Sequence, residues 1–360
     1  SARPRHYWAA EEDAEKARER KREAACGRVR QNEVSGARQF LTSNGLAPSS
    51  ARTLTELRDP ARRPRTITRE IPAEVLGYEP QAEFKLDADK LFECLSTARK
   101  GRAADLFGTR LEHLRVLLDS GPHWDTFVEM ARAFSKGDVP QEVLELVKLG
   151  RMTALKKDVT GCAFRRLVSK AVARQCASLL NKATAPYQFA LQTRAGMDAL
   201  AHAIRALTDA NPELVVLSLD GIGAFDHVRR AEFLQALHAE PELANLLPMV
   251  RSLYSSPSTF LWVDDKGEVH EIQQGEGGEQ GDPLMPALYS LGQHRALKLA
   301  AARLLPGEHL FAYLDDLHLG CTKARAAAAF QEVADRVAVH AGVQTHLGKL
   351  RAWCSGGGAA

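Results

Sequence analysis

In the stretch Leu217-Ser-Leu-Asp220-Gly-Ile-Gly-Ala-Phe225-Asp226, a carboxylate directly follows an apolar run. The run, Val215 to Leu219, predicts a buried strand that ends at Asp220. A second stretch, Phe311-Ala-Tyr313-Leu-Asp315-Asp316-Leu317, predicts a hairpin with two adjacent carboxylates at its tip. If strand and hairpin lie side by side, three carboxylates converge and repel one another unless cations pair with them. Two divalent cations would remove that cost and supply the chemistry of nucleotidyl transfer.

A third stretch, Gly278-Glu-Gln280-Gly281-Asp282-Pro283, lies between the other two along the chain. With the three in this order, the sequence resembles the reverse transcriptase domain of LINE-type (non-LTR) retrotransposons, and more broadly reverse transcriptases. The resemblance implies an α+β fold, with a polymerase palm made of an antiparallel sheet backed by helices. It also implies a largely helical fingers region, and the family's thumb is absent from this chain.

The activity that the resemblance implies is that of an RNA-directed DNA polymerase, a nucleotidyltransferase. Such an enzyme adds deoxynucleotides to a DNA primer 3′-hydroxyl on an RNA template. Its cofactors would be two Mg²⁺ ions, for which Mn²⁺ could substitute, and its substrates deoxynucleoside triphosphates. Two alternatives stay open. One is a catalytically degenerate remnant that at most binds nucleic acid, and the other is a relative of intron maturases or RNA-dependent RNA polymerases.

Composition places the chain among ordinary globular proteins, since 45% of it is hydrophobic and 26% is charged. The net charge of +3 excludes a global polycation, so local grooves would have to bind nucleic acid. The six cysteines form no Cys-x-x-Cys pair, which predicts reduced thiols in an intracellular protein. No run reaches the roughly 20 apolar residues of a membrane helix, so we expect no membrane partner. The resemblance alone implies action in the nucleus, and the sequence does not indicate an oligomeric state. Because the chain begins at Ser1 rather than Met, we expect it to be a piece of a longer protein.

Three regions follow from the patterning and the resemblance: a charged helical and linker extension over 1–74, fingers over 75–210 and a palm over 211–354. In the extension, the mixed-charge run Glu11–Arg22 predicts a solvated helix, with a basic nucleic-acid patch as the alternative. Residues 43–72 predict a linker or extended arm. Its Arg62-Arg-Pro-Arg65 is read as an exposed loop, with phosphate contact as the alternative.

Helical spacing of apolar residues recurs from about Ala88 onward. It predicts helices around 91–118, 127–134, 143–149, 165–180, 197–207, 231–237, 243–254, 283–305 and 324–340. A hairpin is predicted over 260–272, and its Asp264-Asp265-Lys266-Gly267 is read as an ordinary turn despite the adjacent acids.

The resemblance assigns the metal site. It makes Asp220 the ligand of both metals, helped by the backbone carbonyl of Gly221 or Ile222. Asp315 would be the second direct ligand and Asp316 an auxiliary one. Oxygen ligands of this kind suit Mg²⁺. Asp226 is also in the family pattern, but an N-cap of the following helix is an equal alternative.

The resemblance also implies the substrate contacts. Phe225 would hold its ring against the sugar of the incoming nucleotide and exclude a 2′-hydroxyl, which favours deoxynucleotides; the alternative is a core Phe. Gln280 and Gly281 would lie near the nucleotide, and the preceding Gly275–Gly278 would form a mobile loop. Asp282 and Pro283 are read as the N-cap and first residue of a helix.

Three basic residues complete the candidate set. Lys349 would neutralise or protonate the leaving pyrophosphate, and a surface lysine is the alternative. Lys156 lies in a segment similar to the family's Lys-bearing strand of the fingers. Arg194 lies in a segment similar to one that lines the template, and an ordinary surface arginine is the alternative.

The fingers also depart from the family. The turn and the arginine that follow the Lys strand are missing here, which would remove a bidentate contact with the triphosphate. Arg165 and Arg166 sit in the next predicted helix and are poor replacements.

Overall fold

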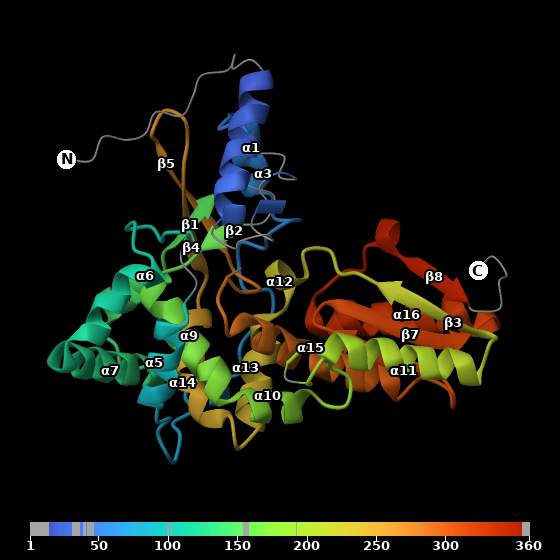
Figure 1. The fold of residues 1–360 in the computed structure, drawn as a ribbon. Coiled ribbons are helices and arrows are strands. Elements are labelled where there is room, and N and C mark those ends of the chain that lie inside the picture. Colours follow the sequence, from blue (N-terminus) through green and yellow to red (C-terminus); the bar gives the residue numbers. More distant parts are fainter. Residues whose placement is uncertain are drawn as a thin grey trace.

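The fold has two separate four-stranded sheets joined by helices: β3, β7 and β8 lie on one side of the molecule, and β1, β2, β4 and β5 lie beside α1 and α3 (Figure 1). The structure, a computed structural model, describes residues 14–30, 37–38, 41, 47–98, 101, 103–153, 158–191, 193–279 and 281–354. Helices and two largely antiparallel sheets alternate along the chain, which confirms the predicted α+β class.

The first sheet has the strand order β6-β7-β3-β8, and every pairing in it is antiparallel. Its strands are β3 (Leu214–Leu219), β6 (His309–Tyr313), β7 (Asp316–Thr322) and β8 (Arg351–Cys354). Alternate residues of β3 face opposite sides. Val215, Leu217 and Leu219 join the main core with α15 (Met285–Ala301) and α16 (Ala326–Arg336), whereas α11 (Gly196–Ala210) covers the other face.

The second sheet has the order β2-β1-β4-β5. Its strands are β1 (Gly150–Thr153), β2 (Asp158–Thr160), β4 (Ser258–Val263) and β5 (Val269–Gln274), and β1 runs parallel to β4. The predicted hairpin over 260–272 is thus confirmed. It lies in the range predicted as palm but pairs with a strand from the range predicted as fingers.

A small second core covers this sheet. It consists of Met152, Phe260, Trp262 and Ile272, and Leu54 and Leu57 of α3 (Ala51–Leu57) pack against it. Part of the predicted linker is therefore a helix that is docked on the second sheet.

One main hydrophobic core contains buried side chains from positions between Ile71 and Val343. It therefore includes residues of both the predicted fingers and the predicted palm. The remaining elements are α1 (Ala14–Arg30), α4 (Ala73–Leu76), α5 (Ala88–Ser96), α6 (Leu111–Leu114), η1 (Arg115–Asp119), α7 (Gly121–Lys136), α8 (Gln141–Lys148), α9 (Ala163–Gln175), α10 (Ala177–Thr184), α12 (Ala224–His227), α13 (Arg230–Ala239), η2 (Ala244–Leu246), α14 (Leu247–Tyr254), η3 (Lys323–Arg325), the π-helix η4 (Val337–Ala341) and η5 (Leu347–Lys349). Among the described residues, no helix combines the length and apolar character needed to span a bilayer.

Helix boundaries differ from the prediction at several places, including the following two. The helix expected over 165–180 is interrupted at Cys176, which ends α9 and precedes α10. The helix expected to begin at Pro283 begins at Met285. Asp282 is therefore not its N-cap, although its Oδ1 accepts a hydrogen bond from Leu284 N at 3.0 Å.

Candidate active site

Strand pairing brings the predicted carboxylates to one edge of the first sheet. The register of β3 against β7 ends at Leu219 opposite Leu317, so Asp220 follows directly beside the start of β7 at Asp316. Tyr313 pairs with Asp316, and this leaves Leu314 and Asp315 as the two-residue tip of the hairpin. The prediction that strand and hairpin lie side by side is confirmed.

The hairpin tip is held by a residue that sequence reasoning missed. Leu314 has a positive φ of 55°, as the first turn residue of a type II′ hairpin does. Gln188, only 5% exposed, accepts a hydrogen bond from Leu314 N at 2.7 Å and donates one to Leu314 O at 3.5 Å. Phe189 N also donates to Ala312 O at 2.9 Å, so the segment around Gln188 lies along β6. This segment was predicted to line the template.

Lys349 contacts the first carboxylate directly. Its Nζ lies 2.5 Å from Oδ2 of Asp220, whose side chain is 25% exposed. Two backbone hydrogen bonds hold the same segments together, from His346 N to Asp220 O and from Ile222 N to Gln344 O, each 2.8 Å. The hydrogen bond to Asp220 raises the pKa of Lys349, and the charges of Asp315 and Asp316 add to this effect. Lys349 therefore lies beside the carboxylates, and its predicted role toward the leaving pyrophosphate stays a prediction.

Tyr289 lies close to the three carboxylates. It is fully buried, and burial raises its pKa well above the ordinary value, with further contributions from Asp315, Asp316 and Asp220. Phe225 stacks on the Tyr289 ring, with ring centroids 4.7 Å apart and 24° between the planes. Tyr289 therefore adjoins both the Phe225 ring and the spot at the sheet edge where the three carboxylates lie.

The donor set at this spot suits a hard cation. It consists of carboxylate oxygens, and the ammonium group on Asp220 shows that the site takes a positive charge. Asp220 and Asp315 line one narrow pocket together with Tyr289 and Gln293.

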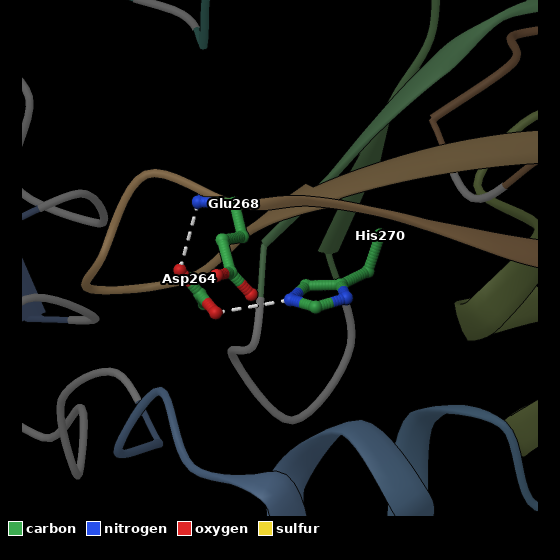
Figure 2. A group of neighbouring side chains, drawn as sticks. All are labelled: Asp264, Glu268 and His270. Carbon is green, nitrogen blue, oxygen red and sulfur yellow. Dashed lines mark hydrogen bonds and ion pairs between the residues drawn. The ribbon is translucent and has the colours of Figure 1, made fainter.

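A tighter cluster of possible metal ligands lies at the tip of the β4–β5 hairpin. Asp264, Glu268 and His270 form the only trio within the described ranges whose ligand atoms all lie within 4.8 Å of one another. Figure 2 shows that both carboxylate oxygens of Asp264 have partners within the hairpin. Its Oδ1 accepts a hydrogen bond from Glu268 N at 2.9 Å, and its Oδ2 contacts His270 Nε2 at 3.0 Å. The His270 hydrogen bond lowers the pKa of Asp264. These contacts close a hairpin turn, as the sequence predicted.

The loop predicted to be mobile is instead buried. Residues 274–279 are all inaccessible to solvent. Gly277 N donates to Val228 O at 2.8 Å, and Gly278 N donates to Phe225 O at 3.0 Å. A Cβ on Gly277 would lie 2.2 Å from Phe225 O. The glycines therefore allow two backbone segments to pack in contact, and the prediction of mobility was wrong.

Two fully buried arginines fix the same loop. The Arg165 guanidinium pairs with Glu279 and Asp282 and lies over the Tyr254 ring, 5.2 Å from its centroid. Arg230 lies 5.3 Å from the same ring and donates to Gly277 O at 2.9 Å and Gln274 O at 3.1 Å. Burial opposes the charge of Arg165, but its acidic neighbours outweigh burial and raise its pKa. Because Arg165 is buried and paired, it cannot reach a nucleotide, as the sequence indicated.

The other candidates lie around this centre or cannot be placed. Gly281 is exposed, with a positive φ of 98° directly before Asp282. Ile222 is 43% exposed, and Arg194 is exposed in the turn before α11. Lys156 and Gln280 lie outside the described residues. Asp226 lies within α12 and pairs with Arg63 at 3.7 Å, and the N-cap of the following helix is Arg229, so Asp226 is not that N-cap.

Comparisons with known proteins bear on this arrangement. A model of the family described as "Reverse transcriptase (RNA-dependent DNA polymerase)" matches residues 156–356, more than half of the chain. No curated protein matches the sequence. A solved structure similar to this chain is that of telomerase from Candida albicans in complex with a TWJ fragment of telomeric RNA, at 12% identity and a TM-score of 0.42. The similarity covers 53% of this chain and 34% of that chain, so the match spans about a third of the telomerase chain.

Proposed function

Since this chain belongs to the reverse transcriptase (RNA-dependent DNA polymerase) family, we propose that it extends a DNA primer on an RNA template with deoxynucleotides. The observation that carries the proposal is the placement of Asp220, Asp315 and Asp316 at one edge of the first sheet, with Phe225 stacked on the adjoining Tyr289. We assign the chain to the LINE type of retroelement on its three motifs, and we expect it to act in the nucleus.

Each group has a role in this proposal. Asp220 and Asp315 hold two divalent cations, Mg²⁺ by preference, with Asp316 and the Ile222 carbonyl in support. When bound, such a pair of ions activates the primer hydroxyl and neutralises charge on the leaving pyrophosphate. Phe225 excludes a 2′-hydroxyl by its bulk.

Lys349 and the exposed residues near the loop complete the site. The Lys349 ammonium moves from Asp220 to the leaving group, where it neutralises negative charge or donates a proton. Gly281 lets the backbone approach the nucleotide, with Gln280 beside it. Lys156 contacts the triphosphate, and Arg194 contacts the template.

The test is primer extension on a primed RNA template with four deoxynucleotides and Mg²⁺ or Mn²⁺. Asp315→Asn should abolish extension. Asp265→Asn is the matched control, since it makes the same charge change at the tip of the other hairpin that carries an Asp-Asp pair. It should leave extension unchanged.

The outcomes separate the candidate functions. Extension that depends on Asp315 supports the proposal. A folded chain that binds the primed template but never extends it would point to the degenerate remnant. A preference for ribonucleotides would favour an RNA-dependent RNA polymerase.

A further inference from the structure

The segment 61–68 runs beside the candidate nucleotide site although it lies outside the range that matches the family. It follows α3, which is docked on the second sheet. His227 Nε2 lies 3.0 Å from the carbonyl oxygen of Ala61, and Gly275 N donates to Pro64 O at 2.6 Å. The segment therefore contacts two loops. One is residues 222–228, which include the short helix α12 and are called the Phe225 loop below, and the other is the glycine-rich loop 275–278.

The backbones of these three segments pack in direct contact. A Cβ on Gly275 would lie 2.0 Å from the carbonyl carbon of Thr66, and one on Gly277 would lie 2.5 Å from the carbonyl carbon of Asp226. The glycine-rich loop thus packs against both the segment 61–68 and the Phe225 loop, with no room for a Cβ at Gly275 or Gly277. Thr68 adds two hydrogen bonds of 2.6 Å, from its N and its Oγ1, to the buried carboxylate of Glu276.

Arg63 connects this stack to the second sheet. Its side chain is 14% exposed and pairs at 3.7 Å with Asp226, which is 13% exposed and directly follows Phe225. The same guanidinium lies 5.8 Å from the centre of the Phe260 ring on β4 and donates to Met152 Sδ on β1 at 3.7 Å. The sequence interpretation of Arg63 as part of an exposed loop was therefore wrong.

We propose that the segment 61–68 is part of the nucleotide-selecting apparatus, with Arg63 as the positioning residue that fixes the Phe225 loop against the second sheet. Removing Arg63 would abolish its ion pair with Asp226 and weaken the link between the Phe225 loop and the second sheet, so that Phe225 could shift relative to the carboxylates. The part that concerns sugar selection rests on the proposed function, whereas the positioning of the loop does not.

Amide hydrogen exchange tests the positioning without any need for activity. In Arg63→Ala, the amides of 222–228 and 275–278 should exchange roughly tenfold faster, because local opening becomes easier. Arg52→Ala is the control. It removes an arginine from α3 whose pair with Glu56 is exposed, and exchange in both loops should stay as in the wild type. Unchanged exchange in Arg63→Ala would overturn the proposal.

Nucleotide discrimination tests the consequence. We expect the preference for deoxynucleotides over ribonucleotides to fall by roughly fivefold or more in Arg63→Ala, since small displacements of a positioned group carry large kinetic costs. Combining Arg63→Ala with Asp226→Asn should add little beyond either single change, because both break the same contact. An active Arg63→Ala enzyme with wild-type discrimination would refute the selection role. A wild-type chain without incorporation would instead refute the proposed function, and exchange would still decide the positioning.

Discussion

Lys349 occupies the place on Asp220 where the family's chemistry requires a cation. A divalent ion bound to Asp220, as we propose, would have to displace this ammonium group, so the two positive charges would compete for one carboxylate. The contact is solvent-accessible, since the Lys349 side chain is 52% exposed, so the exchange needs no opening of the core.

From this competition we predict the behaviour of Lys349→Met. Its apparent affinity for Mg²⁺, measured as the rise in Tm with added ion, should be roughly fivefold higher than that of the wild type, because no ammonium competes. Primer extension by the same variant should be slower by about 10²-fold, because the leaving group loses its acid. Lys266→Met, at the exposed tip of the β4–β5 hairpin, should change neither quantity. An unaltered Mg²⁺ response in Lys349→Met would contradict the competition.

At the scale of single residues, a position in the site could be predicted from the sequence only where the residue's contacts lie close to it along the chain. The places of Asp220 at the end of a strand and of Asp315 at a hairpin tip were predictable because each belongs to a short pattern with its own strand or turn signal, whereas the role of Phe225 came from the resemblance alone. Gln188 was assigned only to a template-lining segment, because its contacts with Leu314 join positions 126 residues apart. Arg63 was misread for the same reason: its partners lie on β1, β4 and α12.

At the scale of elements, α15 carries a histidine whose titration affects stability. Burial, with a further effect from the charge of Lys298, lowers the pKa of His294 from 6.5 to about 4. Its ring contacts Tyr187, with centroids 5.8 Å apart, and the nearby pocket also holds Lys182, Glu240 and Glu242.

Between pH 6.5 and 4, the unfolded chain binds a proton at His294 that the folded chain does not. Stability therefore falls as the pH falls through this window, by on the order of 3 kcal/mol from this group. In His294→Gln, urea unfolding at a series of pH values should show a weaker acid-induced loss than the wild type. His202→Gln, on the exposed side of α11, should follow the wild-type curve. Identical pH dependence in His294→Gln would refute the assignment.

Long apolar patterns predicted their elements well, and short ones did not. The helices predicted over 127–134 and 324–340 correspond to α7 and α16, although α7 is longer and α16 continues into a π-helix, and the β4–β5 hairpin lies where it was predicted. Strands β1, β2 and β8 have only three or four residues, too few for a period to show, and β1 and β8 also pair with strands distant in sequence. From the sequence alone, the glycines of 275–278 indicate a flexible backbone. In the structure, their lack of side chains instead allows backbone segments to pack in contact.

At the scale of the whole molecule, a buried charged network links the two predicted regions. Arg165 comes from α9, Tyr254 from α14, and Glu279 and Asp282 from the loop before α15. Tyr254 donates to Asp282 at 2.8 Å and accepts from Arg165 at 2.9 Å. Within the described residues these ions are shielded from water, so each one depends on its partners for compensation.

Arg165→Met should therefore lower the free energy of unfolding by about 3–5 kcal/mol, since it leaves two buried carboxylates without their cation. Arg174→Met lies on the same helix but removes an exposed pair with Glu93, 42% and 50% accessible, and should cost about 1 kcal/mol or less. Urea unfolding followed by circular dichroism and by tryptophan fluorescence measures both. Adding Glu279→Gln and Asp282→Asn to Arg165→Met should recover part of the loss, because the unpaired charges are then removed as well. Equal costs for Arg165→Met and Arg174→Met would mean that the network does not hold the two regions together.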